Sequence, residues 1–456
     1  MHPILFHIPL PHMPLRLWWA LALVALVALA FGVSDLRRGD KSSAVSPILT
    51  ALGAAAVAWV MRDKTIDAPN LPMFSYGVLL GLALIAGWFV ALRTADKGGL
   101  PKDTVATAYV IGAISAILAA RFTHVAFHWE DFDTWSEPVK HLTASEKGKS
   151  ALSNFLARVL SLRSGGLSTY GGMLGALGTT LWFLRSNAED VPSAFRRWAD
   201  ALAPAFGVGT ILVGLGAYLH GGDFGVRLSE GAPGFLRKLG TFPRWPEGGD
   251  AGAGSPAWIR HREQYLGTPL GADMVHTDKA LPVHPTQIYV MLGGVLIASV
   301  AWALLQKRSG KPAHKPGIVA AVAAYIYAFS TFLIETVRDR VDSGSSYLSG
   351  AKHLLVPLCL ALFALAFAYG IALIIQKAAT RKYVRYASFA LPLIAYLVMR
   401  PATFAGEEEY GLSGTQLFSL LLAAAASRLS ADAWRRPAES VTARVAMTDD
   451  DDAELA

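Results

Sequence analysis

Apolar and polar residues follow one another along this chain in long blocks rather than residue by residue. Apolar runs of roughly the length that crosses a bilayer recur from the first quarter of the chain almost to its end. They lie at 17–33, 44–61, 73–92, 105–120, 170–184, 203–219, 286–305, 317–334, 354–376, 386–399 and 411–427. The pattern predicts an all-α polytopic integral membrane protein with about eleven transmembrane helices.

Composition narrows the class of protein further. With 53% hydrophobic and only 16% charged residues among 456, the chain is too apolar for a soluble fold. The formal net charge of +7 would suit nucleic acid, but the basic residues gather at the ends of apolar runs instead of on one face. The single cysteine, Cys359, lies inside an apolar run, which excludes a disulfide framework and a Cys-x-x-Cys metal site.

Every second loop between the apolar runs is basic, which predicts how the chain is oriented in the membrane. By the positive-inside rule these loops face the cytoplasm, so the N-terminus is outside and the C-terminus is cytoplasmic. The long stretch 221–283, rich in glycine, proline and aromatic residues, then forms a small irregular extracytoplasmic lobe. The tail with Asp449 to Asp452 is expected to be disordered.

A glycine-rich stretch, Gly165 to Gly175, stands where a long polar loop meets the fifth apolar run. It places Ser168 and Tyr170 among glycines, with Gly171 and Gly172 directly following. Backbone amides and hydroxyl groups at such a site can approach a lipid headgroup closely. The alternative is that the Gly-x-x-x-Gly spacing lets membrane helices pack against one another.

A second candidate site is the segment from Leu281 to Tyr289. Pro285 is predicted in the first turn of a helix, with His284 at its cap and Gln287 in the same turn. Such a helix start binds anions, and His284 would add a proton donor or acceptor. A helix that merely begins with proline is the alternative.

Four polar residues share one face of a predicted membrane helix. These are Tyr327, Thr331, Glu335 and Arg338. A carboxylate in a membrane span is a candidate functional group, although Glu335 can also serve only to pair with Arg338. Arg121, at the end of the fourth run, is a further candidate, with snorkelling as the alternative.

His220 and Asp223 stand among glycines where the sixth apolar run opens into the lobe. One histidine and one aspartate are too few ligands for a metal, so no metal site is predicted. A transporter is disfavoured, because the sequence shows neither an inverted repeat nor a chain of ionisable residues through the spans.

Taken together, these motifs resemble the bacterial prolipoprotein diacylglyceryl transferase family, of which the chain looks like a divergent member. The resemblance rests on Phe-Ser-Tyr76-Gly77, on Ala-Ala-Arg121, on Gly-Gly-Leu-Ser-Thr-Tyr-Gly-Gly-Met-Leu-Gly and on His284-Pro-Thr-Gln-Ile-Tyr289. It covers about 72–377. The implied domains are an N-terminal extension with two extra helices (1–70), a transferase-like core (71–377), two extra C-terminal helices (378–430) and an acidic cytoplasmic tail (431–456).

The resemblance implies a reaction in the bacterial inner membrane. The diacylglyceryl group of phosphatidylglycerol would move to the lipobox cysteine of a preprolipoprotein, with release of glycerol phosphate. The implied partners are phosphatidylglycerol, the lipobox segment and the bilayer, without nucleic acid. No metal, nucleotide or other cofactor is implied.

The resemblance and the motifs together assign the site residues. Tyr170 or His284 would handle the proton, Glu335 would position an arginine, and Arg121 and Arg338 would supply charge for the headgroup. The expected lipid-binding set is completed by Tyr76, Ser168, Gly171, Gly172, His220, Gln287, Tyr289 and Tyr327. The family's arginine positions hold Gly214 and Thr331 here, so a relative that binds phospholipid or lipoprotein without turnover is the alternative function.

Overall fold

The computed structural model of the chain describes most of its length. The described residues are 4–9, 15–37, 41–60, 62, 65–66, 70–98, 100–132, 151–160, 168–188, 190–244, 254–308, 311–312, 314–339, 348–400 and 409–436. Gly165 and Gly166 and the acidic tail lie outside these ranges. The chain divides into two compact units, one of 1–5, 74–111 and 180–456 and one of 6–73 and 112–179. Each unit is described by itself.

Membrane-length helices confirm the prediction of an all-α membrane protein. Within the described residues, six helices are long and apolar enough to cross a bilayer: Ser75–Ala95, Lys102–Phe127, Val191–His220, Thr286–Leu305, Ile318–Glu335 and Lys352–Ile374. Each of the predicted apolar runs overlaps a helix, but the others are shorter, broken or less apolar, so a count of eleven spans is not confirmed. In a bilayer, helices of this kind satisfy every backbone polar group internally.

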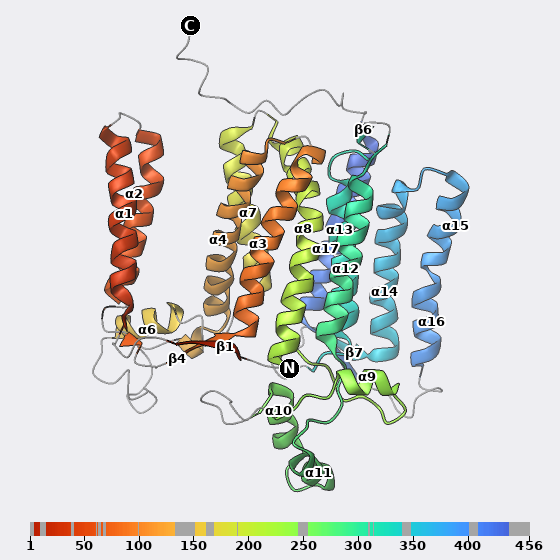
Figure 1. Cartoon of the computed structure of the whole chain (residues 1–456). Coiled ribbons are helices and arrows are strands. Elements are labelled where there is room, and N and C mark those ends of the chain that lie inside the picture. Colours follow the sequence, from red (N-terminus) through yellow and green to blue (C-terminus); the bar gives the residue numbers. More distant parts are fainter. Residues whose placement is uncertain are drawn as a thin grey trace. The chain divides into compact units, whose positions relative to one another are not determined.

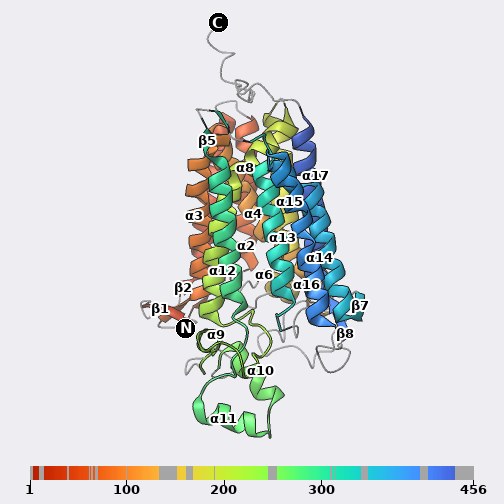
Figure 2. The same cartoon turned by 90° about the vertical axis from the view of Figure 1, so that its right-hand side faces the viewer.

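The first unit is built around a bundle of upright helices (Figures 1 and 2). Its main members are α3 (Ser75–Gly98), α8 (Val191–His220), α12 (Thr286–Leu305), α13 (Ile318–Glu335), α14 (Lys352–Tyr369) and α17 (Gly414–Arg435). In the bundle α8 packs between α3 and α12, and α13 packs between α12 and α17. A Cβ at Gly207 of α8 would lie 2.5 Å from the backbone nitrogen of Ala298 in α12, so glycine permits this close approach.

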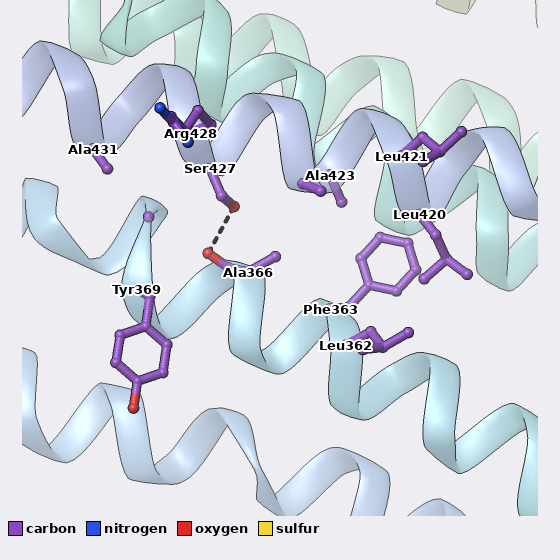
Figure 3. Close-up of a pocket in the computed structure, with 12 residues that line it drawn as sticks. Leu362, Phe363, Ala366, Tyr369, Leu420, Leu421, Ala423, Ser427, Arg428 and Ala431 are labelled. Carbon is purple, nitrogen blue, oxygen red and sulfur yellow. Dashed lines mark hydrogen bonds between the residues drawn. The ribbon is translucent and has the colours of Figure 1, made fainter.

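Of the C-terminal helices, α17 is part of the bundle core, although the sequence suggested only extra helices in this region. Strand β7 (Leu348–Ala351) pairs antiparallel with β8 (Glu409–Leu412), and α17 follows directly. Between them run a 3-10 helix (Ile371–Ile374), α15 (Ala378–Ser388) and α16 (Ala390–Met399). Phe332 of α13, Phe363 of α14 and Ala423 of α17 are buried in one hydrophobic cluster. On the outer surface of the bundle, an apolar groove runs between α14 and α17 (Figure 3).

The lobe follows α8 at the end of the bundle where α12 begins (Figure 1). Its described part contains three short helices, α9 (Gly234–Leu239), α10 (Pro256–Gln264) and α11 (Pro269–Thr277), so it is not wholly irregular. Phe242, Trp258, Met274 and Val283 form its buried core. A Cβ at Gly240 would lie 1.8 Å from the carbonyl oxygen of Val283, so this contact requires glycine.

The second unit contains the N-terminal helix pair and the segments around the glycine-rich stretch. Helices α1 (Leu17–Arg37) and α2 (Lys41–Val60) pack as a hairpin. The unit also holds α5 (Trp129–Phe132), α6 (Ala151–Leu160) and parts of α4 (Lys102–Phe127) and α7 (Thr169–Asn187), which continue into the first unit. Strand β1 (Ile4–Pro9) pairs with β4 (Asn70–Phe74), and β2 (Leu15–Arg16) pairs with β3 (Thr65–Ile66). In the first unit, β5 (Lys307–Arg308) pairs with β6 (Lys311–Pro312).

Candidate functional site

The first unit gathers many of the predicted site residues at the end of the bundle that carries the lobe. Three segments meet there: the loop after α8, the start of α12 and the turn after α13. The predicted site residues at this end of the bundle lie in these segments or next to them: Tyr76, His220, His284, Gln287, Tyr289, Tyr327, Glu335 and Arg338. The other candidates belong to the second unit.

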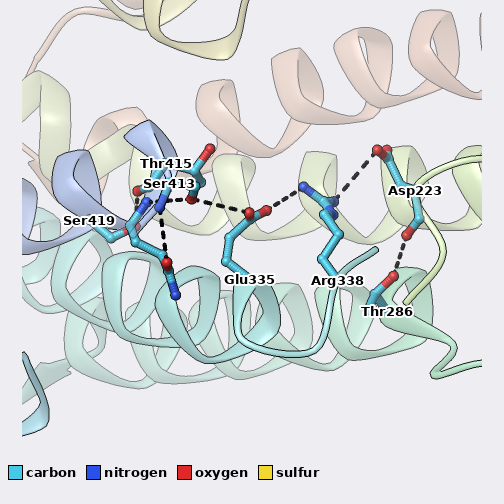
Figure 4. A network of polar contacts seen from close by, with 8 residues as sticks. Asp223, Thr286, Glu335, Arg338, Ser413, Thr415 and Ser419 are labelled. Atoms are coloured by element: carbon cyan, nitrogen blue, oxygen red, sulfur yellow. Dashed lines mark hydrogen bonds and ion pairs between the residues drawn. The ribbon is translucent and has the colours of Figure 1, made fainter. Parts of the chain in front are cut away.

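An ion-pair network is the centre of this site. Arg338 Nη1 lies 2.5 Å from Glu335 Oε1, and its Nη2 lies 3.7 Å from Asp223 Oδ1. Figure 4 shows the guanidinium between the two carboxylates. Glu335 is buried, whereas the Asp223 side chain is 60% exposed. Burial alone would lower the pKa of Arg338, but the charges of Asp223 and Glu335 outweigh it and raise the pKa.

Helix α17 supplies a hydrogen-bond donor to the same carboxylate. Ser413 Oγ donates to Glu335 Oε2 at 3.4 Å, so both carboxylate oxygens have partners. Ser413 is held by a capping box with Gln416, whose Nε2 donates to the Tyr410 hydroxyl at 2.7 Å. Neither Ser413 nor Gln416 was among the predicted site residues. The Ser-x-x-Gln pattern of the cap is visible in the sequence, but its contact with Glu335 is not.

Backbone contacts among three short segments hold Arg338 and His284 close to each other. Gly225 pairs with Arg338, and its amide donates to the carbonyl of His284 at 2.9 Å. A Cβ at Gly225 would lie 2.5 Å from the Val337 oxygen and 2.6 Å from His284 Cβ. Gly225 therefore allows the two segments to approach from opposite sides.

His284 stands just before α12, and its predicted place as the cap is wrong. Pro285 occupies the N-cap position, because Thr286 is already the first helical residue. His284 Nδ1 instead lies 3.2 Å from the Tyr289 hydroxyl, one turn into the helix. Burial lowers the pKa of His284, so its imidazole is neutral near pH 7.

The first turn of α12 fixes the loop that follows α8. Thr286 Oγ1 donates to the carbonyl of Asp223, and Gln287 Nε2 donates to the carbonyl of Gly222. Asp223 adopts a left-handed backbone (φ 55°), a conformation that aspartate tolerates better than most residues. The Tyr76 ring packs edge-on against His220, the last residue of α8, at 6.4 Å. The predicted polar residues at this helix start therefore position Asp223.

At the two positions where the family resemblance implies arginine, this chain has Gly214, which has no room for a side chain, and Thr331, which bonds to a neighbouring tyrosine. A Cβ at Gly214 would lie 2.8 Å from Met291 Cγ and 3.1 Å from the Gln287 oxygen, so α12 fills the space of a side chain. Thr331 instead forms a side-chain hydrogen bond with Tyr327, one turn away on the same helix. Of the residues described in this bundle end, Arg338 is the arginine paired with Glu335.

In the second unit, Arg121 is buried against α6 instead of lying exposed. Its Nε and Nη2 donate to the carbonyls of Val159 and Arg158, each at 2.7 Å. These carbonyls end α6, where a cation is favoured by the helix dipole. The guanidinium also lies over the Phe132 ring, 5.1 Å from its centroid. Arg121 therefore holds the end of an amphipathic helix.

The glycine-rich stretch packs closely against α4. A Cβ at Gly171 would lie 2.3 Å from Thr123 Oγ1, and one at Gly175 would lie 2.4 Å from Ala119 Cβ. A Cβ at Gly172 would face the same helix, 3.4 Å from the Ala116 oxygen. Ser168 begins α7, since the Gly171 amide donates to its hydroxyl. These contacts support the helix-packing interpretation for the described part of the stretch, including the turn that carries Tyr170.

The described residues contain no group of three His, Cys, Asp or Glu side chains placed to hold a metal ion. The site's chemistry in this part of the chain is that of an arginine between two carboxylates, a neutral histidine and several hydroxyl groups. Such a set can bind an anion and accept a proton.

Comparison with known proteins identifies the family of the chain. A model of the prolipoprotein diacylglyceryl transferase family matches residues 64–376, close to the predicted range. A phosphatidylglycerol–prolipoprotein diacylglyceryl transferase of Bacillus cytotoxicus is 27% identical over 164 residues, which are 35% of this chain and 52% of the relative. Its counterpart in Bacillus cereus is 26% identical over 170 residues, 36% of this chain and 54% of the relative. The chain thus spans about half the length of these relatives. Because the family model covers more than half of the sequence, the chain belongs to the prolipoprotein diacylglyceryl transferase family.

Proposed function

We propose that this protein transfers the diacylglyceryl group of phosphatidylglycerol to the lipobox cysteine of a preprolipoprotein. The cysteine sulfur forms a bond to the glyceryl carbon, and the bond from that carbon to the phosphate oxygen breaks. The thiol proton passes to a base, and glycerol phosphate leaves. The reaction needs a cation for the phosphate, a base for the thiol and a site that excludes bulk water. The relatives are named for the same donor and acceptor.

The observation that carries this proposal is the position of Arg338 between a buried and an exposed carboxylate. Glu335, held by Ser413, fixes one side of the guanidinium. Asp223 is more distant and solvent-exposed, so a phosphodiester can take its place at Nη2. Arginine binds phosphate with two parallel hydrogen bonds, which orients the leaving group as well as stabilising its charge.

His284 is the proposed base. The lowered pKa keeps the imidazole unprotonated at neutral pH, and the Tyr289 hydroxyl orients the ring through Nδ1. Gly225 allows the segments of His284 and Arg338 to lie close together. The proposed reaction requires this, because His284 is the base and Arg338 binds the phosphate. Tyr170 of the second unit is the alternative group for proton transfer.

The remaining predicted residues have supporting roles in this proposal. Gln287 fixes the loop that carries Asp223, and Tyr76 packs against His220 at the start of that loop. Tyr327 lies close enough to Glu335 and Arg338 to interact with their charges. In the second unit, Gly171 and Gly172 set the close packing of α7 on α4, while Arg121 anchors α6. The amphipathic α6 would lie at the membrane surface, where lipid and preprolipoprotein arrive.

We place the protein in the bacterial inner membrane with the Arg338 site on the outer side. In the first unit the lobe lies at the end of the bundle where α13 finishes (Figure 1), and Glu335 is the last residue of α13. Basic residues such as Arg93, Lys315 and Arg428 belong to the opposite helix ends, which the positive-inside rule assigns to the cytoplasm. The N-terminus is then outside and the C-terminus inside.

The test is a transfer assay with the purified full-length chain in phosphatidylglycerol vesicles and a lipobox peptide. We expect release of glycerol phosphate and a mass increase of one diacylglyceryl group on the peptide thiol. Arg338→Gln should slow the reaction by about 10²- to 10³-fold, the usual effect of removing one preorganised donor. Arg244→Gln, which removes an exposed lobe arginine, is the matched control. A folded sample that binds phosphatidylglycerol but releases no glycerol phosphate would refute the proposal.

A relative that binds phospholipid without turnover is the second candidate, and Gly214 and Thr331 favour it. The packing of α12 against Gly214 shows that an arginine there requires more than one substitution. This candidate predicts phosphatidylglycerol binding without product, and Thr331→Arg would then restore measurable transfer. Growth rescue of a bacterium depleted of its own transferase by the unaltered chain would exclude it.

A further inference from the structure

The groove between α14 and α17 is separate from the Arg338 site. From Ser413 at the start of α17 to Arg428 in the groove, the helix rises about 22 Å. The groove has a volume of about 540 Å³ and is lined mainly by apolar side chains. It is open to the surroundings, since Leu421 is 69% exposed. No residue of the proposed catalytic site lines it.

Small residues on both helices create the groove. Ala366 of α14 and Gly370, the residue directly after α14, face Ala423, Ala424 and Ser427 of α17. Ser427 Oγ donates to the Ala366 carbonyl at 2.7 Å, and a Cβ at Gly370 would lie 2.4 Å from the Ser427 Cα and Cβ atoms. The hydroxyl is thereby occupied within the protein, and the space above it is apolar. A hydrocarbon chain suits such a channel.

One end of the groove is basic. Figure 3 shows Arg428 and Tyr369 at the same end, with Leu362 and Leu421 at the other. Arg385 of α15 lies over the Tyr369 ring at 5.9 Å, and its Nε is buried without a hydrogen-bond partner among the described residues. Arg428 pairs at 3.4 Å with Asp432, and its side chain is 83% exposed. Arg428 thus lines the basic end of the groove, where its exposed pair with Asp432 is a weak one, and Arg385 contacts a second lining residue, Tyr369.

We propose that this groove binds an anionic phospholipid, with one acyl chain along α14 and α17 and the phosphate bound by Arg385 and Arg428. Arginine is the side chain best suited to a phosphodiester, and basic pockets between membrane helices recognise anionic headgroups. The positive charge at one end favours a lipid over a second copy of the chain, because a second copy would bring the same arginines against it. The site lies at the end of the bundle away from Glu335, so a lipid molecule held there is separate from the one that reacts at the Arg338 site.

The test is photo-crosslinking of the full-length protein in phosphatidylcholine vesicles that contain a little phosphatidylglycerol with a diazirine on one acyl chain. We expect labelled peptides from 362–370 and 420–431, with competition by unlabelled phosphatidylglycerol but not by phosphatidylcholine. The double variant Arg385→Gln/Arg428→Gln should weaken labelling by about 10- to 30-fold, the combined effect of two arginines near an anionic group. The groove-filling variant Ala424→Trp should abolish it with both arginines present.

The control is the double variant Arg93→Gln/Arg185→Gln, which removes the same charge from exposed helix ends outside the groove. It should label like the unaltered protein, and all variants should show normal thermal unfolding. Three results would each overturn the proposal: equal competition by phosphatidylcholine, labelling that survives both groove variants, or cross-linked dimers joined through these peptides. Because the transfer assay is independent of this measurement, either proposal can fail alone.

Discussion

The role of Arg338 depends on the two carboxylates around it. The sequence placed Glu335 one helical turn before it and left open whether the pair is structural or functional. The structure confirms the pair and adds Asp223, from a loop far away in the sequence. A buried glutamate bonded to one side of the guanidinium leaves the other side for a ligand, so pairing and function are compatible.

The Glu335–Arg338 pair should be needed for stability as well as for transfer. Arg338→Gln leaves a buried carboxylate without its cation, which typically costs about 3 kcal/mol of unfolding free energy. Thermal unfolding in detergent should show the loss, and Glu335→Gln/Arg338→Gln should recover most of it. The matched control is Arg244→Gln, which breaks an exposed pair with Asp278 and should cost less than about 1 kcal/mol. Equal losses for both arginines would contradict this interpretation.

At the scale of single elements, α17 is the main surprise. Sequence reasoning gave the last two helices no role, because the resemblance ends near Lys377. In the structure the cap of α17 lies against the Glu335 carboxylate, 78 residues away along the chain. An element outside the matched family region therefore contributes to the site through its N-cap residue, Ser413.

Ser413 is accordingly expected to act as a positioning residue. Ser413→Ala removes the donor to Glu335 Oε2 and should lower kcat about tenfold, the effect expected for the loss of one hydrogen bond, with little change in KM. Ser413→Thr should restore most of the rate, because it keeps the hydroxyl. Ser255→Ala, which removes the comparable cap of α10, is the control and should cost only about 1 kcal/mol of stability. If Ser413→Ala matched this control in transfer rate, the cap of α17 would be structural alone.

At the scale of the whole molecule, the lobe should respond to acid. His261 is buried in α10, where burial lowers its pKa to about 4; Arg227 and Arg260 add to the effect, while Asp339 opposes it. Between pH 6.5 and about 4 the unfolded lobe binds a proton that the folded lobe does not. The free energy of unfolding of the lobe therefore has its full value above pH 6.5 and falls as the pH is lowered from 6.5 to about 4.

Hydrogen exchange of 254–283 at pH 7 and pH 5, corrected for intrinsic rates, measures this effect. Exchange should be faster at pH 5, and His261→Phe should remove most of the pH dependence. His276→Gln changes an exposed histidine of the same lobe and should leave the dependence intact. A pH dependence that persists in His261→Phe would assign it to another group.

Much of the molecule was predictable because membrane helices are local features. Long apolar runs predicted the helices, their flanking charges predicted an orientation, and period-3.6 spacing placed Tyr327 and Glu335 on one face. The glycine-rich stretch likewise contained its own explanation, since Gly171 and Gly175 are spaced for close contact along one side of α7. Which helices are long enough to span was less certain, because helix breaks depend on neighbours.

The sequence by itself determined the class of protein, its family and the chemical types of its site residues, since hydropathy and motifs are read from neighbouring positions. Only the tertiary structure decided that Asp223 and Ser413 join Glu335 and Arg338, and that Arg121 holds α6 instead. It also decided that α12 fills the space beside Gly214. These outcomes depend on which helices pack together and how closely. Such packing is set by side-chain shape across elements far apart in the chain, to which no local pattern refers.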